Sequence, residues 1–96
     1  MLIIAGHVTV APEQRDELVR AFADLVRRSR EAPGCLDAAV TADSVDPARI
    51  NNFERWRSRE ELEAWRARCG APDVGDALRA VDVRMFDASG ERSPFD

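Results

Sequence analysis

The sequence lacks the features that mark several large classes of protein. Its 14 basic residues include no lysine, its net charge is −4, and its arginines are spread among acidic residues without a dense basic run. This distribution argues against nucleic acid as the main partner, because proteins that bind nucleic acid gather Lys and Arg on one surface. No apolar run approaches the roughly 18 residues that a membrane span requires, so no membrane partner is expected.

Groups that hold metals or redox cofactors are equally scarce. His7 is the only histidine, which is too little for a metal site, and Cys35 and Cys69 lack the spacing of metal or redox motifs. We therefore expect no metal and two free thiols in a reducing, cytoplasmic setting. There is no phosphate loop and no dinucleotide fingerprint, so no bound flavin or nicotinamide is expected either.

What the chain does contain is the pattern of a small α+β domain. Its 96 residues suggest one domain over residues 1–96, with a polar tail at 88–96 that we expect to be mobile towards its end. The opening "MLIIAGHVTV" has no positive n-region and alternates like a strand, so we interpret it as a strand and not as a signal peptide.

Hydrophobic periodicity and turn residues predict the other elements. "APEQ" places Pro12 at the start of a helix, which ends at Pro33 and Gly34. Ser58 and Glu61 form a capping-box pattern that opens a second helix. The predicted strands are Leu2–Val10, Cys35–Ala42, Ile50–Trp56 and Val81–Phe86, and a short third helix is predicted over Asp73–Ala80.

The resulting order, β-α-β-β-α-β, is typical of the ferredoxin-like split βαβ fold, an antiparallel sheet with helices on one face. Helices can cover only that one face, although the other also carries apolar residues. A second copy packing sheet against sheet would cover it, so we expect a homodimer through the open sheet face.

Four segments of the chain resemble the antibiotic biosynthesis monooxygenase family, whose domains are dimeric α+β barrels. The segments are "IIAGHVTVAPEQRDELVRAFADLV", "EAPGCLDAAV", "DPARINNFERWRSREELEAW" and "VDVRMFD", and they cover nearly the whole chain. The resemblance implies a fold, and it leaves several functions open. The family includes cofactor-free monooxygenases that oxidise anthrone-like polyketides, haem-degrading enzymes, and isomerases of small signalling sugars.

Asn52 and Trp56 are the candidate catalytic pair. They are four residues apart on one predicted strand and therefore share a face. The resemblance to the cofactor-free monooxygenases is sharpest here, since that branch has Asn and Trp at this spacing. The Asn52 amide would donate to a developing oxyanion, and the Trp56 ring would stack on a flat substrate. The alternative is that Trp56 is a core residue and Asn52 bonds to backbone or water.

Three further residues are candidates for proton transfer or charge. Glu54 would accept from a backbone amide or an arginine, or act as a general base. His7 is a possible proton acceptor, although alternation with Val8 directs it away from the helices. Arg84 would bind an anionic substrate oxygen or pair with Glu54, and a plain salt bridge is the alternative.

Apolar candidates complete the expected site. Phe22, Leu25 and Trp65 would line the pocket, although helical spacing alone makes them core residues. Trp65 stands where many relatives have His. The haem-degrading branch, as the resemblance implies, uses an Asn on strand one and a His on helix two. In this sequence Gly6 stands at the position of that Asn, and the second helix has no His, so haem cleavage is ranked low.

The sequence therefore predicts a cofactor-independent monooxygenase that oxidises a planar phenolic or anthrone-like substrate with O₂. Two alternatives stay open: a dimeric ligand-binding or stress-response module without turnover, and an isomerase of a small polar metabolite. An apolar cavity above about 300 Å³ lined by Asn52 and Trp56 would favour the monooxygenase.

Overall fold

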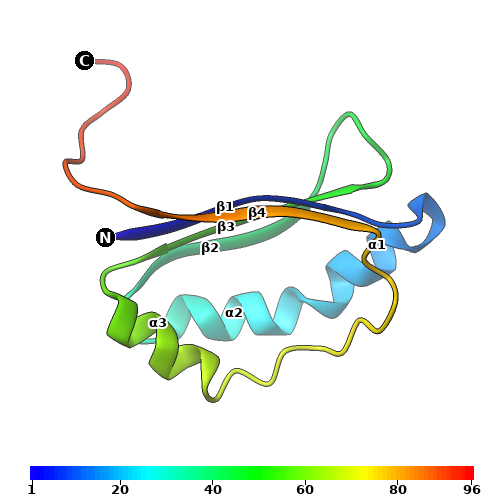
Figure 1. The fold of residues 1–96 in the computed structure, drawn as a ribbon, viewed down its shortest axis with the longest axis horizontal. Helices are drawn as coiled ribbons and strands as arrows, with labels where there is room; N and C mark the ends of the chain where they lie inside the picture. The colour runs from blue at the N-terminus through cyan, green and yellow to red at the C-terminus, as the bar shows by residue number, and fades with distance from the viewer.

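The strands of the computed structural model, which describes residues 1–96, form one antiparallel sheet in the order β2-β3-β1-β4. The strands are β1 (Leu2–Thr9), β2 (Cys35–Ala42), β3 (Arg49–Trp56) and β4 (Ala80–Asp87). The helices are α1 (Pro12–Ala21), α2 (Ala23–Glu31) and α3 (Arg59–Arg66), and all lie on one side of the sheet (Figure 1). The predicted ferredoxin-like fold is confirmed.

The register of the strands decides which side chains meet the helices. Ile4 lies opposite Glu54 and Gly6 lies opposite Asn52, and residues directly opposite one another share a face of the sheet. This face is the covered one, because Ile4 is 6% exposed and belongs to the core. That core joins both central strands to α3 and to the residue after α2. Its members are Leu2, Ile4, Ala32, Trp56, Leu62 and Trp65.

The first predicted helix is broken at Phe22 into α1 and α2. The Phe22 N–H is shared between the carbonyls of Leu18 (3.3 Å) and Val19 (3.2 Å), and its φ and ψ are −89° and −7°. Neither Gly nor Pro stands at the break, so the sequence gives no sign of it. Both helices pack over β2, and α1 also packs over β3.

The short helix predicted over Asp73–Ala80 is wrong. The segment 67–79 contains no helix and runs on the helix side of the sheet from α3 to β4 (Figure 1). Gly75 has a φ of +54°, and its N–H bonds to Oδ1 of Asp73 at 2.9 Å. This local side-chain bond offers the backbone an alternative to a helical turn.

The helices do not extend over β4. Val81 lies opposite Val8 on the covered face, yet it is 62% exposed. The opposite face of the sheet has no cover from this chain and carries Ile3, Ala5, Phe53 and Phe86. Beyond β4, residues 88–96 form no strand or helix and extend past the sheet (Figure 1). No helix is long and apolar enough to span a membrane.

Candidate functional site

Asn52 stands in the middle of β3, between Gly6 of β1 and Val40 of β2, and faces the helices. Its Oδ1 is buried and has no hydrogen-bond partner. Leaving a buried acceptor unpaired costs about 1–3 kcal/mol, so such a group calls for an explanation. A ligand that donates a hydrogen bond would supply the missing partner.

A cavity of about 290 Å³ lies in front of Asn52, between strands β2 and β3 and helices α2 and α3. Five of the residues expected at the site line it together. They are Phe22, Leu25, Asn52, Glu54 and Trp65. Its volume lies just below the 300 Å³ that the sequence analysis set as the lower limit, which is also the lower end of the range for pockets that bind small molecules.

Trp56 does not line this cavity, in contrast to the arrangement expected from the sequence. Its side chain is fully buried in the core, and its indole N–H donates to Oε1 of Glu54 at 2.9 Å. Trp56 and Asn52 therefore do not contact one ligand together, and any effect of Trp56 on a ligand is indirect. Trp56 orients the Glu54 carboxylate, and that carboxylate faces the cavity.

Glu54 is the only carboxylate in the wall. It is half-buried, and its partner is Trp56 and not the backbone amide or arginine that were expected. Arg84 is not available to it, because Arg84 lies opposite Ala5 on the uncovered face while Glu54 lies opposite Ile4 on the covered one. The Arg84 guanidinium instead lies 3.5 Å from Asp82.

His7 is also placed on the uncovered face, opposite Asn51 of β3 and Asp82 of β4. The alternation of β1 requires this, since Gly6 and Val8 on either side face the helices. His7 and Arg84 therefore share a face with each other and do not reach the cavity. Within the cavity, Glu54 remains as the proton acceptor.

Trp65 forms part of the far wall and is 5% exposed. Two guanidinium groups flank its ring, with the Cζ atoms of Arg28 and Arg68 at 5.7 and 5.1 Å from the centroid. Arg28 also donates to the Cys69 carbonyl at 2.9 Å. These contacts fasten the end of α3 and the start of segment 67–79 to α2, and so hold this wall in place.

Sequence reasoning missed several residues of the wall. They are Val26, Ser29, Ala38, Ala39, Val40, Phe53, Arg66, Cys69 and Ala71. Cys69 could have been found, since it follows Leu62 and Trp65 at helical spacing. Ala71 could not, because the segment after α3 has no periodic pattern. Arg66 is the only arginine in the wall, where Arg84 had been expected.

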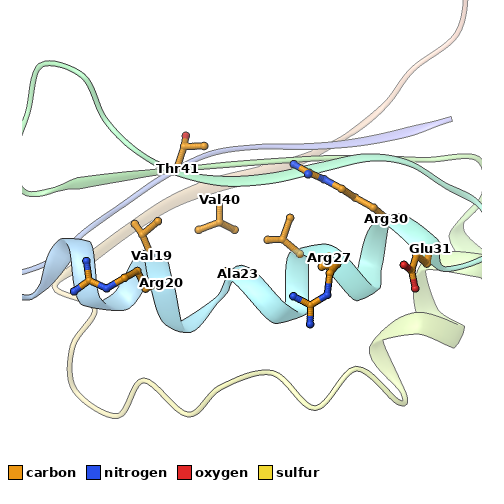
Figure 2. A pocket seen from close by; sticks show the side chains of 9 residues that line it. Val19, Arg20, Ala23, Arg27, Arg30, Glu31, Val40 and Thr41 are labelled. Atoms are coloured by element: carbon orange, nitrogen blue, oxygen red, sulfur yellow. The ribbon is translucent and has the colours of Figure 1, made fainter.

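The largest hollow is elsewhere. An open groove of about 500 Å³ runs between the outer side of α1 and α2 and the edge strand β2. Figure 2 shows Val19 and Val40 facing each other across it, while Arg20 and Arg27 point away from β2. Asn52 and Glu54 do not line it. The chain also holds no group of three or more His, Cys, Asp or Glu side chains that could ligate a metal ion.

Comparison with known families identifies one match. The family model described as antibiotic biosynthesis monooxygenase matches residues 1–79. An uncharacterized protein of Synechocystis sp., sll1783, is 27% identical over 62 residues. That match covers 65% of this chain, and it spans only 42% of the length of the relative.

Solved structures share the fold. PA3566 from Pseudomonas aeruginosa has a TM-score of 0.76 at 24% identity, covering 93% of this chain and 94% of that one. The heme-degrader MhuD from Mycobacterium tuberculosis, solved with two hemes bound in its active site, has a TM-score of 0.68 at 16% identity. The match covers 97% of this chain and all of that one.

Proposed function

Because this chain belongs to the antibiotic biosynthesis monooxygenase family, we propose that it is a cofactor-independent monooxygenase that oxidises a planar phenolic or anthrone-like substrate with O₂. The observation that carries the proposal is Asn52, which lines a cavity of about 290 Å³ and whose buried Oδ1 has no hydrogen-bond partner. A carboxamide offers both an acceptor and donors, so it can bind a substrate hydroxyl and then the oxyanion that replaces it.

Glu54 takes the role of general base in this proposal. Its carboxylate accepts the substrate proton, and the electron-rich anion that remains transfers one electron to O₂. The substrate radical and superoxide combine to a peroxide anion, which takes back the proton held by Glu54. The resulting hydroperoxide loses water to give the quinone. One oxygen atom of O₂ is thereby incorporated and the other leaves as water.

The remaining residues position and enclose the substrate. Trp56 fixes the Glu54 carboxylate through its indole N–H, at 2.9 Å. Phe22, Leu25 and Trp65 form apolar walls that exclude water and contact a flat ring. Expulsion of water strengthens the hydrogen bond that Asn52 makes to the developing negative charge.

The haem reaction of MhuD is not part of the proposal. The resemblance to the haem-degrading branch implies an Asn on the first strand, but the corresponding Gly6 has a φ of +152°. A Cβ on Gly6 would lie 2.0 Å from the carbonyl oxygen of Asp82, so no side chain fits there. Helix α3 also carries no His.

We propose further that the protein is a homodimer through the uncovered sheet face. Ile3, Ala5, Phe53 and Phe86 lie on that face, and Phe86 is 52% exposed. Burial of this apolar surface by a second copy supports the dimer.

The free thiols of Cys35 and Cys69 support a reducing, cytoplasmic setting.

Oxygen uptake with a panel of anthrones and hydroquinones tests the activity. We expect the wild-type protein to consume one O₂ per quinone formed and Asn52→Ala to be slower by about 10²–10³-fold, as for loss of an oxyanion donor. Asn51→Ala is the matched control, since Asn51 lies on the opposite face. No uptake by the wild type, or equal loss in both variants, would contradict the proposal.

The same assay separates the two alternatives. Binding of the panel without O₂ uptake identifies a ligand-binding module. An isomer formed without O₂ uptake identifies an isomerase, which the position of Glu54 in the cavity wall also favours.

A further inference from the structure

The segment that connects α3 to β4, yellow in Figure 1, contributes to the walls of two cavities. Its Ala71 lines the larger cavity, beside α2 and α3. Its Val74 and Leu78 line a smaller cavity of about 90 Å³, together with residues of α1 and of strands β1, β2 and β3. Asn52 lines both cavities, so a ligand that reaches Asn52 from either one has this segment beside it.

Hydrogen bonds attach residues 70–78 to the rest of the chain only at their two ends. At the start, Arg28 Nη1 donates to the Cys69 carbonyl at 2.9 Å. At the end, the Arg79 N–H donates to the Thr9 carbonyl at 2.8 Å. Between these two points, the backbone makes hydrogen bonds only within the segment. The middle of the segment can therefore move without breaking a hydrogen bond to the sheet or to a helix.

Apolar contacts hold the segment only weakly. None of residues 70–78 is buried, and Leu78 is 39% exposed. A segment with few buried contacts and few hydrogen bonds to its surroundings opens at a much lower free energy than the whole fold.

Two glycines define the path that the segment follows. Gly70 and Gly75 have φ angles of +60° and +54°, and no atom lies within 4 Å of the place where a Cβ would stand. Glycine adopts positive and negative φ about equally well, so both positions can change conformation at little cost.

We infer that residues 70–78 form a lid, which is closed in this structure and opens to admit a ligand to the cavities. The burial of Asn52 gives the reason for a moving part, because its Oδ1 is covered while the lid is closed. Outward movement of the lid removes Val74 and Leu78 from the wall that they share with Asn52. Closure over a ligand then excludes water. The lid controls access to the cavities, whichever reaction takes place there.

The rate at which a covered thiol reacts with iodoacetamide measures the opening of the lid. Ile50→Cys places this thiol in the smaller cavity, at a position that is 4% exposed. Val10→Cys is the matched control, since Val10 is 0% exposed and lines none of the cavities. Peptide mass spectrometry separates the label at either position from labels on Cys35 and Cys69.

We expect the thiol at position 50 to react at least about tenfold faster than the thiol at position 10, because local opening is more frequent than global unfolding. Its rate should stay constant in urea below the unfolding transition, since opening of the lid exposes little surface. The thiol at position 10 should react faster as urea is added, because only global unfolding exposes it.

Two substitutions in the lid should shift it towards the open state. A β-branched side chain is strained at a positive φ, so Gly70→Val and Gly75→Val both disfavour the closed path. Each should raise the labelling rate of Ile50→Cys by about 5- to 30-fold. Gly90→Val is the matched control and should leave this rate unchanged. Gly90 has a φ of +77° and equally free surroundings, but it lies in the tail beyond β4.

Equal labelling rates at positions 50 and 10 that both rise with urea would overturn the lid. An equal effect of all three glycine variants, or no effect of any, would also overturn it. If circular dichroism shows that Ile50→Cys is unfolded, Leu18→Cys reports on the same cavity, and its response to the glycine variants decides. No substrate is used, so failure of the lid leaves the proposed function standing, and an absence of O₂ uptake leaves the lid standing.

Discussion

Asn51 and Asn52 are adjacent and identical in chemistry, yet they have opposite surroundings. The Asn51 side chain accepts from Arg49 Nε at 2.7 Å and donates to Asp43 at 2.9 Å. Asn52 faces the helices, and its buried oxygen has no partner. The alternation of a strand separates the two. We therefore infer that Asn51 has a structural role and that Asn52 is the one of the two that could bind a ligand.

The contact between Trp56 and Glu54 leads to the first prediction. Trp56→Phe keeps an aromatic ring in the core but removes the N–H that donates to Glu54. Losing a hydrogen bond to a charged group should lower kcat by about tenfold to a hundredfold, with KM little changed. Glu54→Gln, which removes the base itself, should lower kcat by about 10²–10⁴-fold.

Steady-state O₂ uptake measures both variants, and thermal melting checks that both are folded. A Glu54→Gln protein with wild-type kcat would remove Glu54 as the base. A folded Trp56→Phe protein whose KM alone has changed would show that Trp56 does not act through the carboxylate.

At the scale of elements, the β2–β3 turn depends on Asp43. The backbone N–H of Asp46, the Asn51 side chain and the backbone N–H of Val45 donate to its carboxylate, and together they lower its pKa from 3.8 to about 2. Because folding lowers the pKa of Asp43, its carboxylate stabilises the folded state at pH values above the ordinary pKa of 3.8. This contribution should be lost as the pH falls from about 4 to about 2.

The second prediction follows from this loss of stability at low pH. The melting temperature of the wild type should fall more steeply between pH 4 and pH 2 than that of Asp43→Asn, which has no carboxylate to protonate. Asp76→Asn is the control, because the Asp76 side chain makes no hydrogen bond or ion pair, and it should follow the wild type. Parallel curves for the wild type and Asp43→Asn would contradict the assignment.

The third prediction concerns the start of α3. Ser58 Oγ accepts from the Glu61 N–H at 3.2 Å, which confirms half of the expected capping box. The Glu61 side chain instead pairs with Arg57 and Ser58 Oγ. Ser58→Ala should lower the free energy of unfolding by about 1 kcal/mol in urea denaturation. Ser44→Ala, which removes a hydroxyl without a partner, should change it little, and an equal effect in both would argue against the cap.

The elements also show how far a single sequence is informative. The four strands were predicted to within about one residue at each end, because alternation and turn residues are local signals. The break at Phe22 was missed, since neither Gly nor Pro nor any other local signal marks it. The helix predicted over Asp73–Ala80 failed because a turn of local bonds competes with a short helix, which has little stability alone.

For the whole molecule, the uncovered sheet face leads to the fourth prediction. If a second copy covers it, Phe86→Glu places a charge in the interface and should convert the dimer to a monomer in sedimentation equilibrium. Val81→Glu is the matched control, since Val81 is exposed on the other face of the same strand. A wild-type monomer at tens of micromolar, or dissociation by both variants, would contradict the interface.

The sequence by itself determined the order of the strands and the alternation along each of them, by which Asn52, Glu54 and Trp56 share one face and His7 lies on the face opposite Gly6. These properties follow from the period of two along a strand. Only the tertiary structure decided which of the helix-facing groups reach a cavity. Trp56 and Asn52 share a face, yet one is enclosed by α3 and the other is left without a partner, because the helix layer covers the sheet unevenly.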